Sequence, residues 1–204
     1  MEEKKYTADS IQTLEGIVHV RLRPQMYFQE CFDKKNLNAL VSDSLCHAVD
    51  EYFDGICNEI SIRINGNIMV IEYNAGMSLE TSNGLTKAEC IMTKIGACSN
   101  EKKHLEVGAE FCHLGMATVN AVTDKCEVKT IWNKKQGYFI FEKGYTTFKE
   151  ILTSKNSKDS TQISFEMSKG IFGELEFEWE DLQLRLNSLR EKLPNLKIEL
   201  YKLS

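Results

Sequence analysis

The segment around Asn65-Gly66 limits the possible folds of this chain more than any other. Apolar and polar residues alternate through 59–64 and again through 67–73, which is typical of strands with one buried face. Asn-Gly tolerates the positive backbone angles of a two-residue turn, so the segment predicts a β-hairpin. Residues 37–53 come shortly before it and place apolar side chains three and four positions apart, which predicts a helix.

The rest of the chain carries the same two kinds of pattern. We expect three further helices and four further strands. The expected helices are 86–95, 111–122 and 176–193, and the expected strands are 125–132, 137–143, 161–167 and 196–201. Residues 96–110 are polar and irregular, so we expect a loop there. Helices and antiparallel strands in such blocks predict an α/β (α+β) two-layer sandwich.

Composition and charge narrow the class of protein. The chain has 204 residues, 42% of them hydrophobic and 27% charged, so we expect residues 1–204 to form a single globular domain. Its 25 basic and 30 acidic residues give a net charge of −5, so we expect no direct DNA binding. The apolar runs are too short to span a membrane, the N-terminus lacks a signal-peptide core, and the seven cysteines form no closely spaced pair. These features predict a cytoplasmic protein with reduced thiols and no membrane partner.

Short motifs in a fixed order resemble one known family. The clearest are Leu-Glu-Gly at 14–16 and Arg-Leu-Arg-Pro-Gln-Met-Tyr at 21–27. The matching segments together are 6–16, 20–27, 37–51, 54–73, 88–93, 119–121, 160–161 and 176–201. They are similar to the ATPase domain of the B subunits of DNA gyrase and topoisomerase IV, and they extend over nearly the whole chain.

The resemblance implies the GHKL-type ATPase fold, a mixed sheet covered on one face by helices. It implies ATP and Mg²⁺ as cofactors, a topoisomerase-related protein as partner, and a homodimer formed through an N-terminal arm, residues 1–10. In the family a transducer domain follows the ATPase domain. This chain ends at Ser204, where that domain would begin, so we expect no transducer domain.

The resemblance assigns two ATP-site positions to the expected helix 37–53. Asp43 aligns with the catalytic general base, a glutamate, and is one methylene shorter; a displacement of about 1 Å can lower a rate about 100-fold. His47 aligns with the asparagine whose oxygen holds Mg²⁺, and imidazole nitrogen is a poor ligand for that ion. Alternatively, Asp43 and His47 pair on a solvated helix face. A transition metal could also bind, because Asp43, His47, Asp50 and Asp54 fall along one face of the helix.

The adenine-binding positions follow the second hairpin strand. Tyr73 aligns with the aspartate that accepts a hydrogen bond from the adenine amino group, and a bond to a charged group is worth about 1.5–3 kcal/mol. Asn74 and Gly76 stand in the same nucleotide-binding segment. Thr161 matches a threonine that supports adenine through water. The alternative is that Tyr73 is a core aromatic at a strand end and Thr161 an ordinary strand threonine.

The phosphate lid and the arm supply the last candidates. The family lid is rich in glycine because bare backbone amides close on the triphosphate. In the matching run, 109–115, only Gly115 remains, and Glu110 would repel phosphates; Gly115 could instead permit close helix packing. Tyr6 lies five residues before Ile11, the spacing of the arm tyrosine that reaches the partner subunit's nucleotide. It could equally be a frayed arm residue.

Four elements of the ATP site therefore change together. We predict a gyrase-B-like domain that binds Mg·ATP weakly or not at all, a pseudo-ATPase that acts as an interaction or regulatory module. The alternative is a divergent but active topoisomerase ATPase domain that recognises nucleotide through Asn74, Thr161 and a remodelled lid. A third interpretation is an acidic protein that competes with gyrase for its partners.

Overall fold

The computed structural model describes residues 15–97, 103–108, 111–156 and 158–202. The main strands are β1 (Glu59–Asn65), β2 (Ile68–Tyr73), β5 (Thr123–Trp132), β6 (Lys135–Glu142), β7 (Tyr145–Thr153), β8 (Ser160–Met167) and β9 (Lys197–Lys202). Within the described residues these seven strands form one sheet in the order β7-β6-β5-β8-β2-β1-β9. Neighbouring strands are antiparallel except β1 and β9, which are parallel, so the sheet is mixed. A separate short pair consists of β3 (Thr81–Ser82) and β4 (Leu85–Thr86).

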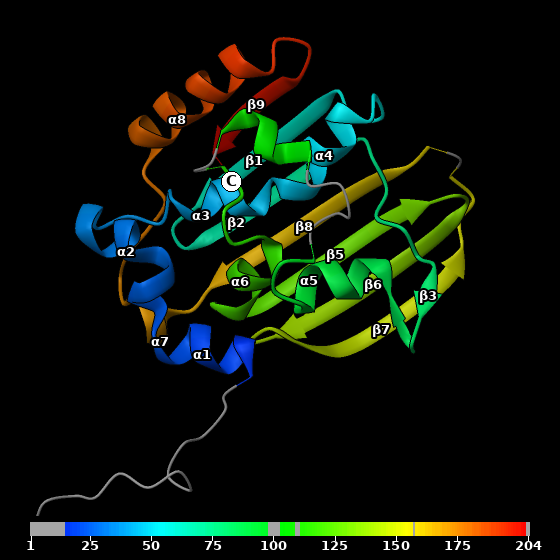
Figure 1. Ribbon diagram of the computed structural model, residues 1–204, viewed down its shortest axis with the longest axis horizontal. Coiled ribbons are helices and arrows are strands. Elements are labelled where there is room, and N and C mark those ends of the chain that lie inside the picture. Colours follow the sequence, from blue (N-terminus) through cyan, green and yellow to red (C-terminus); the bar gives the residue numbers. More distant parts are fainter. Residues whose placement is uncertain (1–14, 98–102, 109–110, 157, 203–204) are drawn as a thin grey trace, which may run out of the picture.

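Helices gather on one face of this sheet (Figure 1). They are α1 (Gly16–Leu22), α2 (Pro24–Lys34), α3 (Leu40–Ser44), α4 (Cys46–Phe53), α5 (Lys87–Thr93), α6 (Met116–Ala121), α7 (Lys169–Phe172), α8 (Trp179–Lys192) and the 3₁₀-helix η2 (Lys103–Val107). The predicted two-layer α/β architecture is confirmed. Among the described residues, no helix combines the length and the apolar character needed to cross a membrane.

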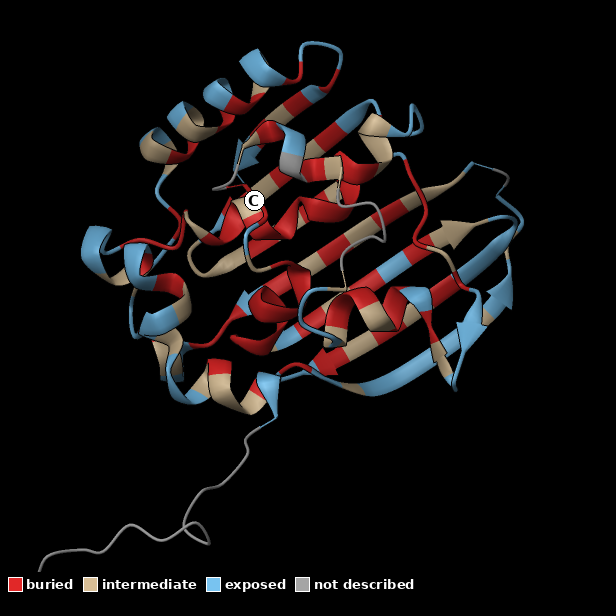
Figure 2. Cartoon of the chain, in the orientation of Figure 1, coloured by how far each residue is buried: buried red, intermediate tan, exposed pale blue. Residues whose placement is uncertain are grey.

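The core lies between the sheet and these helices. Figure 2 shows buried residues alternating with more exposed ones along the central strands. Ile62 and Ile71 face each other across β1 and β2, and both are fully buried. Burying one such side chain contributes about 1.5–3 kcal/mol, and a one-residue slip would turn the whole row to solvent, so the apolar row fixes the register.

The predicted hairpin is confirmed, with its turn one residue later than expected. Asn65 pairs with Ile68, which leaves Gly66 and Asn67 as the two loop residues. Gly66 has a φ of +57°, a conformation that glycine adopts without a steric penalty. The Asn-Gly signal was therefore right, but glycine occupies the first turn position.

Two helix predictions need correction. The helix over 37–53 is broken at Leu45 into α3 and α4. The Ser44 hydroxyl donates to the Leu40 carbonyl over 2.8 Å, and such side-chain bonding to the preceding turn bends helices. The helix expected over 111–122 begins only at Met116, because Cys112 and Gly115 have φ values of +53° and +81°.

The expected helix near 86–95 is present as α5. Its N-terminus carries a capping box, in which the Thr86 side chain accepts from the Glu89 amide and Glu89 bonds back to Thr86. Strand β7 was missed, because most of its residues are exposed at the sheet edge and give no clear alternation. Helices α1, α2 and α7 were not predicted either. The expected loop 96–110 contains η2, while 98–102 and 109–110 lie outside the described residues.

Candidate nucleotide site

Asp43, the expected general base, lies on α3 and is only 7% exposed. Its Oδ1 atom accepts hydrogen bonds from the backbone amides of Leu114, at 2.7 Å, and Gly115, at 2.9 Å. Burial raises the pKa of Asp43 above its ordinary value, and the two amide bonds reduce that shift. The alternative that Asp43 lies on a solvated helix face is therefore wrong.

His47 lies on α4 and is 4% exposed. Its Nδ1 atom is 3.1 Å from the Tyr73 hydroxyl, and its Nε2 atom is 3.5 Å from a carboxylate oxygen of Glu51. Burial lowers the pKa of His47 to about 4, so the ring is neutral at pH 7. The Tyr73 hydroxyl and one ring nitrogen of His47 are within hydrogen-bond distance of each other in a buried place.

The arrangement around His47 does not fit a metal ion. Both ring nitrogens face protein groups, Tyr73 and Glu51. Among the described residues, no three His, Cys, Asp or Glu side chains are grouped so that they could hold a metal. By resemblance, His47 stands where an asparagine would supply an oxygen ligand, and Mg²⁺ prefers oxygen ligands to imidazole nitrogen. The residues at this position therefore do not suit Mg²⁺.

Tyr73 ends β2 and pairs directly with Thr161 of β8. It is 4% exposed, and burial raises its pKa well above the ordinary value, so the phenol is neutral. The Thr161 hydroxyl donates to the Ala75 carbonyl at 2.7 Å and lies 2.9 Å from the Thr130 hydroxyl. Thr130 accepts from the Met77 amide at 2.8 Å. The two threonines thus hold the segment after β2 against the sheet.

Gly76 and Asn74 have structural contacts of their own. A Cβ atom at Gly76 would lie 2.2 Å from the Ile131 carbonyl oxygen, so only glycine fits. The Asn74 side-chain oxygen accepts from the Asn58 and Glu59 amides, each at 3.0 Å, and closes the open end of the hairpin.

Gly115 precedes α6 with φ +81° and ψ 168°, a conformation that disfavours any residue with a Cβ atom. This position therefore favours glycine for its backbone shape, and its amide bonds to Asp43. Tyr6 and the arm, residues 1–10, lie outside the described residues, as do Ala109 and Glu110 of the expected lid.

The chain is similar in sequence to B subunits of DNA gyrase. Over 194 residues the chain is 31% identical to the B subunit of DNA gyrase from Rickettsia typhi, covering 92% of this chain and 24% of that protein. It is 28% identical over 201 residues to the B subunit of DNA gyrase from Thermotoga maritima, with 96% and 31% covered. It matches no protein-family model.

The fold is also similar to that of gyrase B. The crystal structure of the 43K ATPase domain of Thermus thermophilus gyrase B, in complex with an aminocoumarin, superposes with a TM-score of 0.73 and 25% identity. The match covers 93% of this chain and 49% of that one. The chain resembles the ATPase domain of the gyrase B protein. Its architecture is the GHKL-type fold that the motifs implied, and it spans about a quarter of the length of the first curated relatives it matches.

In this gyrase-B-like domain the candidate residues form two groups. His47, Tyr73 and Thr161 converge from α4, β2 and β8. Asp43 and Gly115 form the other group. Asn74 and Gly76 lie in the segment after Tyr73. Asn74 bonds to backbone amides, and Gly76 allows close packing against the Ile131 carbonyl.

Sequence reasoning missed the partners of these residues. Glu51 stands four positions after His47, and helical spacing could have suggested that pair. Thr130 could not have been found, because its contact with Thr161 depends on the register between β5 and β8. His104 pairs with Asp50 at 2.7 Å, from a segment without any periodic pattern.

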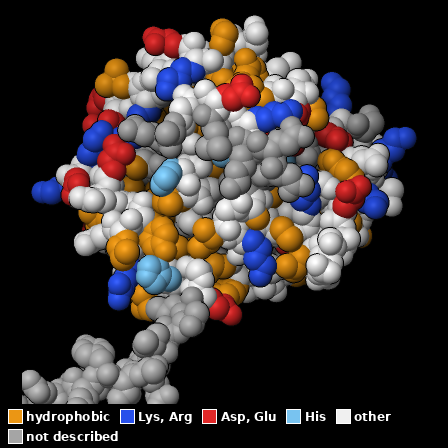
Figure 3. Space-filling model, viewed as in Figure 1, with side chains coloured by type: hydrophobic (Ala, Val, Ile, Leu, Met, Phe, Trp, Pro, Cys, Tyr) orange, Lys and Arg blue, Asp and Glu red, His pale blue; other side chains and the backbone are white. Residues whose placement is uncertain are grey.

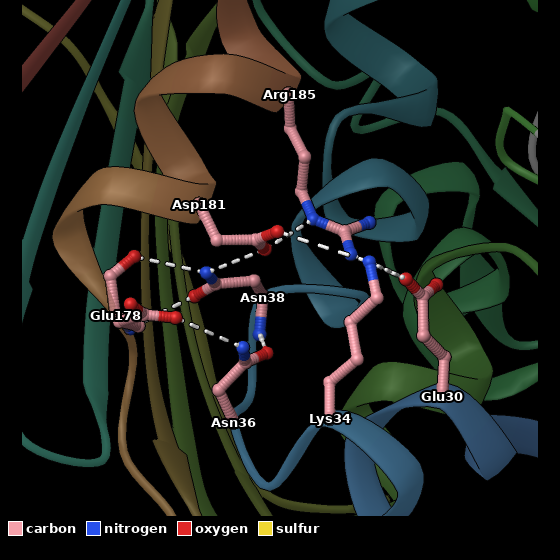
Figure 4. Close-up of polar contacts among 7 residues, drawn as sticks. All are labelled: Glu30, Lys34, Asn36, Asn38, Glu178, Asp181 and Arg185. Carbon is pink, nitrogen blue, oxygen red and sulfur yellow. Dashed lines mark hydrogen bonds and ion pairs between the residues drawn. The ribbon is translucent and has the colours of Figure 1, made fainter.

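A groove of about 450 Å³ opens beside Asp43, between α2, α3, α8 and the residues Val107, Phe111, His113 and Leu114. Arg185 and Glu30 form an ion pair in its wall. They belong to a polar cluster that fastens α8 to the segment before α3 (Figure 4). The cluster consists of Glu30, Lys34, Asn36, Asn38, Glu178, Asp181 and Arg185.

Charges on the helix-covered face are mixed. Figure 3 shows acidic and basic side chains interspersed there, without one broad basic area. Many of them pair with each other, as Arg185 does with Asp181 over 2.7 Å. A duplex-binding surface needs basic groups gathered along one face.

Proposed function

We propose that this gyrase-B-like domain is a degenerate pseudo-ATPase, which binds Mg·ATP weakly or not at all and acts as an interaction or regulatory module. The observation that carries the proposal is the contact between Tyr73 and His47. By resemblance these residues replace the adenine-binding aspartate and the asparagine ligand of Mg²⁺. Both are buried and bonded to each other, so neither is free to serve a nucleotide without rearrangement.

The chemistry of the adenine position supports this proposal. The neutral Tyr73 phenol is engaged with His47 and supplies no carboxylate for an adenine amino group. Losing a charged hydrogen bond costs about 1.5–3 kcal/mol, a factor of roughly 10 to 150 in affinity. The Thr161 hydroxyl donates a hydrogen bond to the Ala75 carbonyl, so it is already used within the protein.

The chemistry of the hydrolytic position supports it as well. A general base must lie within hydrogen-bond reach of the attacking water. Asp43 Oδ1 already accepts two backbone amides, which fix the carboxylate against the segment that precedes α6. A shortened base, held by the backbone, next to a site without a suitable magnesium ligand is poorly arranged for hydrolysis.

The interaction role rests mainly on the resemblance. We propose a topoisomerase-related protein partner, a homodimer through the N-terminal arm that carries Tyr6, and a cytoplasmic location. The mixed charge of the helix-covered face supports a protein partner rather than DNA. Light scattering at high concentration, with and without nucleotide, tests the dimer; a monomeric mass under both conditions argues against it.

Calorimetric titration with Mg·ATP and a non-hydrolysable analogue tests the proposal directly. We expect no binding in the micromolar range, including with Mn²⁺ or Zn²⁺ in place of Mg²⁺. Micromolar binding would contradict the proposal. Phosphate release that disappears in Asp43→Ala but persists in Asp33→Ala, a change at an exposed aspartate of α2, would establish the active alternative.

A further inference from the structure

Strand β7 forms one outer edge of the sheet, next to β6 (Figure 1). An edge strand turns the N–H and C=O groups of alternate residues away from the sheet, where they can pair with another strand. Figure 2 shows β7 exposed over most of its length. Its register with β6 is unbroken from Phe148 to Thr153, so this part of the edge has the regular shape that a further strand needs.

The same strand exposes large apolar side chains. Among the described residues nine such side chains are exposed, and three of them, Tyr145, Phe148 and Leu152, lie on β7. No other described helix or strand carries more than one. Long edge strands with exposed apolar side chains tend to pair with other chains. The edge therefore combines open backbone groups with apolar surface.

The apolar side chains of the regular part lie on the sheet face opposite the helices. Lys149 pairs across the strands with the fully buried Phe139, and its ammonium group lies 2.6 Å from a carboxylate oxygen of Glu89 on α5. Lys149 therefore points to the helix-covered face. Successive strand residues alternate between the two faces, so Phe148 and Leu152 lie on the helix-free face.

Glu150 lies between these two apolar residues on the same face, and it is exposed. Within the part of the chain that the structure describes it has no ion-pair partner, in contrast to Lys149. A strand that covers Phe148 and Leu152 also passes beside Glu150, where a basic side chain forms a favourable cross-strand pair. The unpaired charge therefore favours a basic partner.

The same charge disfavours a second copy of this chain as the partner. If two copies paired antiparallel so that Phe148 faced Leu152, the two Glu150 side chains would stand directly opposite each other. Like charges in that position are destabilising. A strand of different sequence therefore fits the edge better than β7 itself does.

The opposite edge of the sheet, β9, is protected in a way that β7 is not. It carries a lysine at each end, Lys197 and Lys202, and lysine on an edge strand discourages pairing with other chains. The single lysine of β7, Lys149, is instead bonded to Glu89 on the helix-covered face. Of the two edges, β7 is thus the one suited to a partner strand.

We propose that β7 is a docking edge for an extended segment of a partner protein, which adds to the sheet as a further strand beside residues 148–153. On the helix-free face this segment presents an apolar, a basic and an apolar side chain in turn, opposite Phe148, Glu150 and Leu152. In such strand addition, backbone hydrogen bonds supply affinity and the alternate side chains supply specificity. The inference rests on the interaction role proposed above, gives that role a surface, and does not involve the nucleotide site.

Titration of a capped peptide into the whole chain, followed by NMR of the backbone amides, tests this edge. The peptide has threonine at every second position and valine, lysine and valine at successive positions between them. We expect saturable changes at β7 and none at β9. N-methylation of alternate peptide amides, which removes the donors that face β7, should weaken binding at least about tenfold, because several backbone bonds are lost.

A charge exchange tests the role of Glu150. In Glu150→Lys the affinity for the lysine peptide should fall about two- to fivefold. A peptide with glutamate in place of that lysine should bind this variant better than it binds the unmodified chain. Glu150 is exposed, so the variant should fold. Equal affinity of each peptide for both proteins would overturn the proposed pairing.

Tyr201→Ala is the matched control, because Tyr201 is an exposed aromatic residue on β9, the other edge strand. It should bind the lysine peptide as the unmodified chain does, whereas Leu152→Ala should bind it more weakly. Changes confined to β9, or the absence of saturable changes at β7, would overturn the proposal. A dimer that dissociates in Leu152→Ala would assign the edge to a second copy and overturn it as well. Neither result affects the Mg·ATP titration, so the two proposals fail separately.

Discussion

The β1–β2 hairpin and the described residues 103–108 and 111–115, which precede α6, are two ordered regions held by different forces. In the hairpin, backbone bonds form a regular ladder, and a row of buried isoleucines and neighbouring apolar side chains fixes its register. The residues before α6 are held instead by separate polar bonds to Asp43, Asp50 and Lys192. One region rests on a repeated pattern and the other on individual side chains.

This difference bears on how such a domain can change its function while keeping its fold. Apolar burial is shared among many side chains, so the sheet keeps its architecture at 25% identity to the gyrase B domain. A polar contact depends on two particular residues, as between His47 and Tyr73. Exchanging two residues at a site can therefore replace a ligand contact by an internal one without disturbing the sheet.

The largest effect should come from the hairpin core. Ile62→Ala removes a fully buried side chain that faces Ile71 across the two strands. We expect the free energy of unfolding to fall by about 2–5 kcal/mol, because the cavity adds to the lost burial. Urea unfolding measures this loss. Val70→Ala, at a half-buried position, should cost clearly less. Equal losses would mean that the buried isoleucine row stabilises the hairpin no more than its other positions do.

Acid should destabilise the domain through His47. Its pKa is about 4 in the folded chain, against about 6.5 when unfolded. Between these values the unfolded chain binds a proton that the folded chain does not. Stability should therefore fall as the pH is lowered from 6.5 to 4, by about 3 kcal/mol.

The check is urea unfolding at pH 7 and pH 4 for the unmodified chain and His47→Gln. Burial raises the pKa of Asp43 and Glu51, so these groups contribute with the opposite sign. Only the difference between the two proteins isolates His47. The same pH dependence in both proteins would show that the ring is not held neutral by the fold.

Most of the sheet could be predicted, because a buried face leaves a repeating trace in the sequence. The alternation through β1 and β2 was enough to predict the hairpin. Strand β7 left no such trace, since an edge strand is exposed on most positions. The break between α3 and α4 comes from one serine hydroxyl, and a periodic pattern carries no information about a single bond.

The site was predicted only as a set of positions. Resemblance identified Asp43, His47 and Tyr73, and the structure supplies their partners. Asp43 bonds to residues 71 and 72 positions away, and His47 to one 26 positions away. Contacts at such separations depend on how helices and strands pack, which local sequence does not encode.

A smaller effect should follow from Gly76→Ala, which tests how the segment after β2 packs against β5. The added Cβ atom would lie 2.2 Å from the Ile131 carbonyl oxygen, so the segment after β2 must move away from β5. We expect a loss of about 1–3 kcal/mol in thermal or urea unfolding. Gly170→Ala is the control, because its Cβ atom would meet only the Ser168 hydroxyl at 3.6 Å. A harmless Gly76→Ala would mean that this glycine is not required for packing.

The smallest effect should come from Tyr73→Phe, which removes one hydroxyl and keeps the ring. His47 Nδ1 then loses its partner in a buried place. An ordinary hydrogen bond contributes about 0.5–1.5 kcal/mol, so the free energy of unfolding should fall by about 1 kcal/mol. Tyr138→Phe, which removes a hydroxyl bonded to Glu127 on the other face of the sheet, should cost less.

In the double variant Tyr73→Phe, His47→Gln, the two losses should not add, because both changes break the same bond. Additive losses would mean that Tyr73 and His47 stabilise the fold independently, and the contact that carries the proposed function would then have no energetic role.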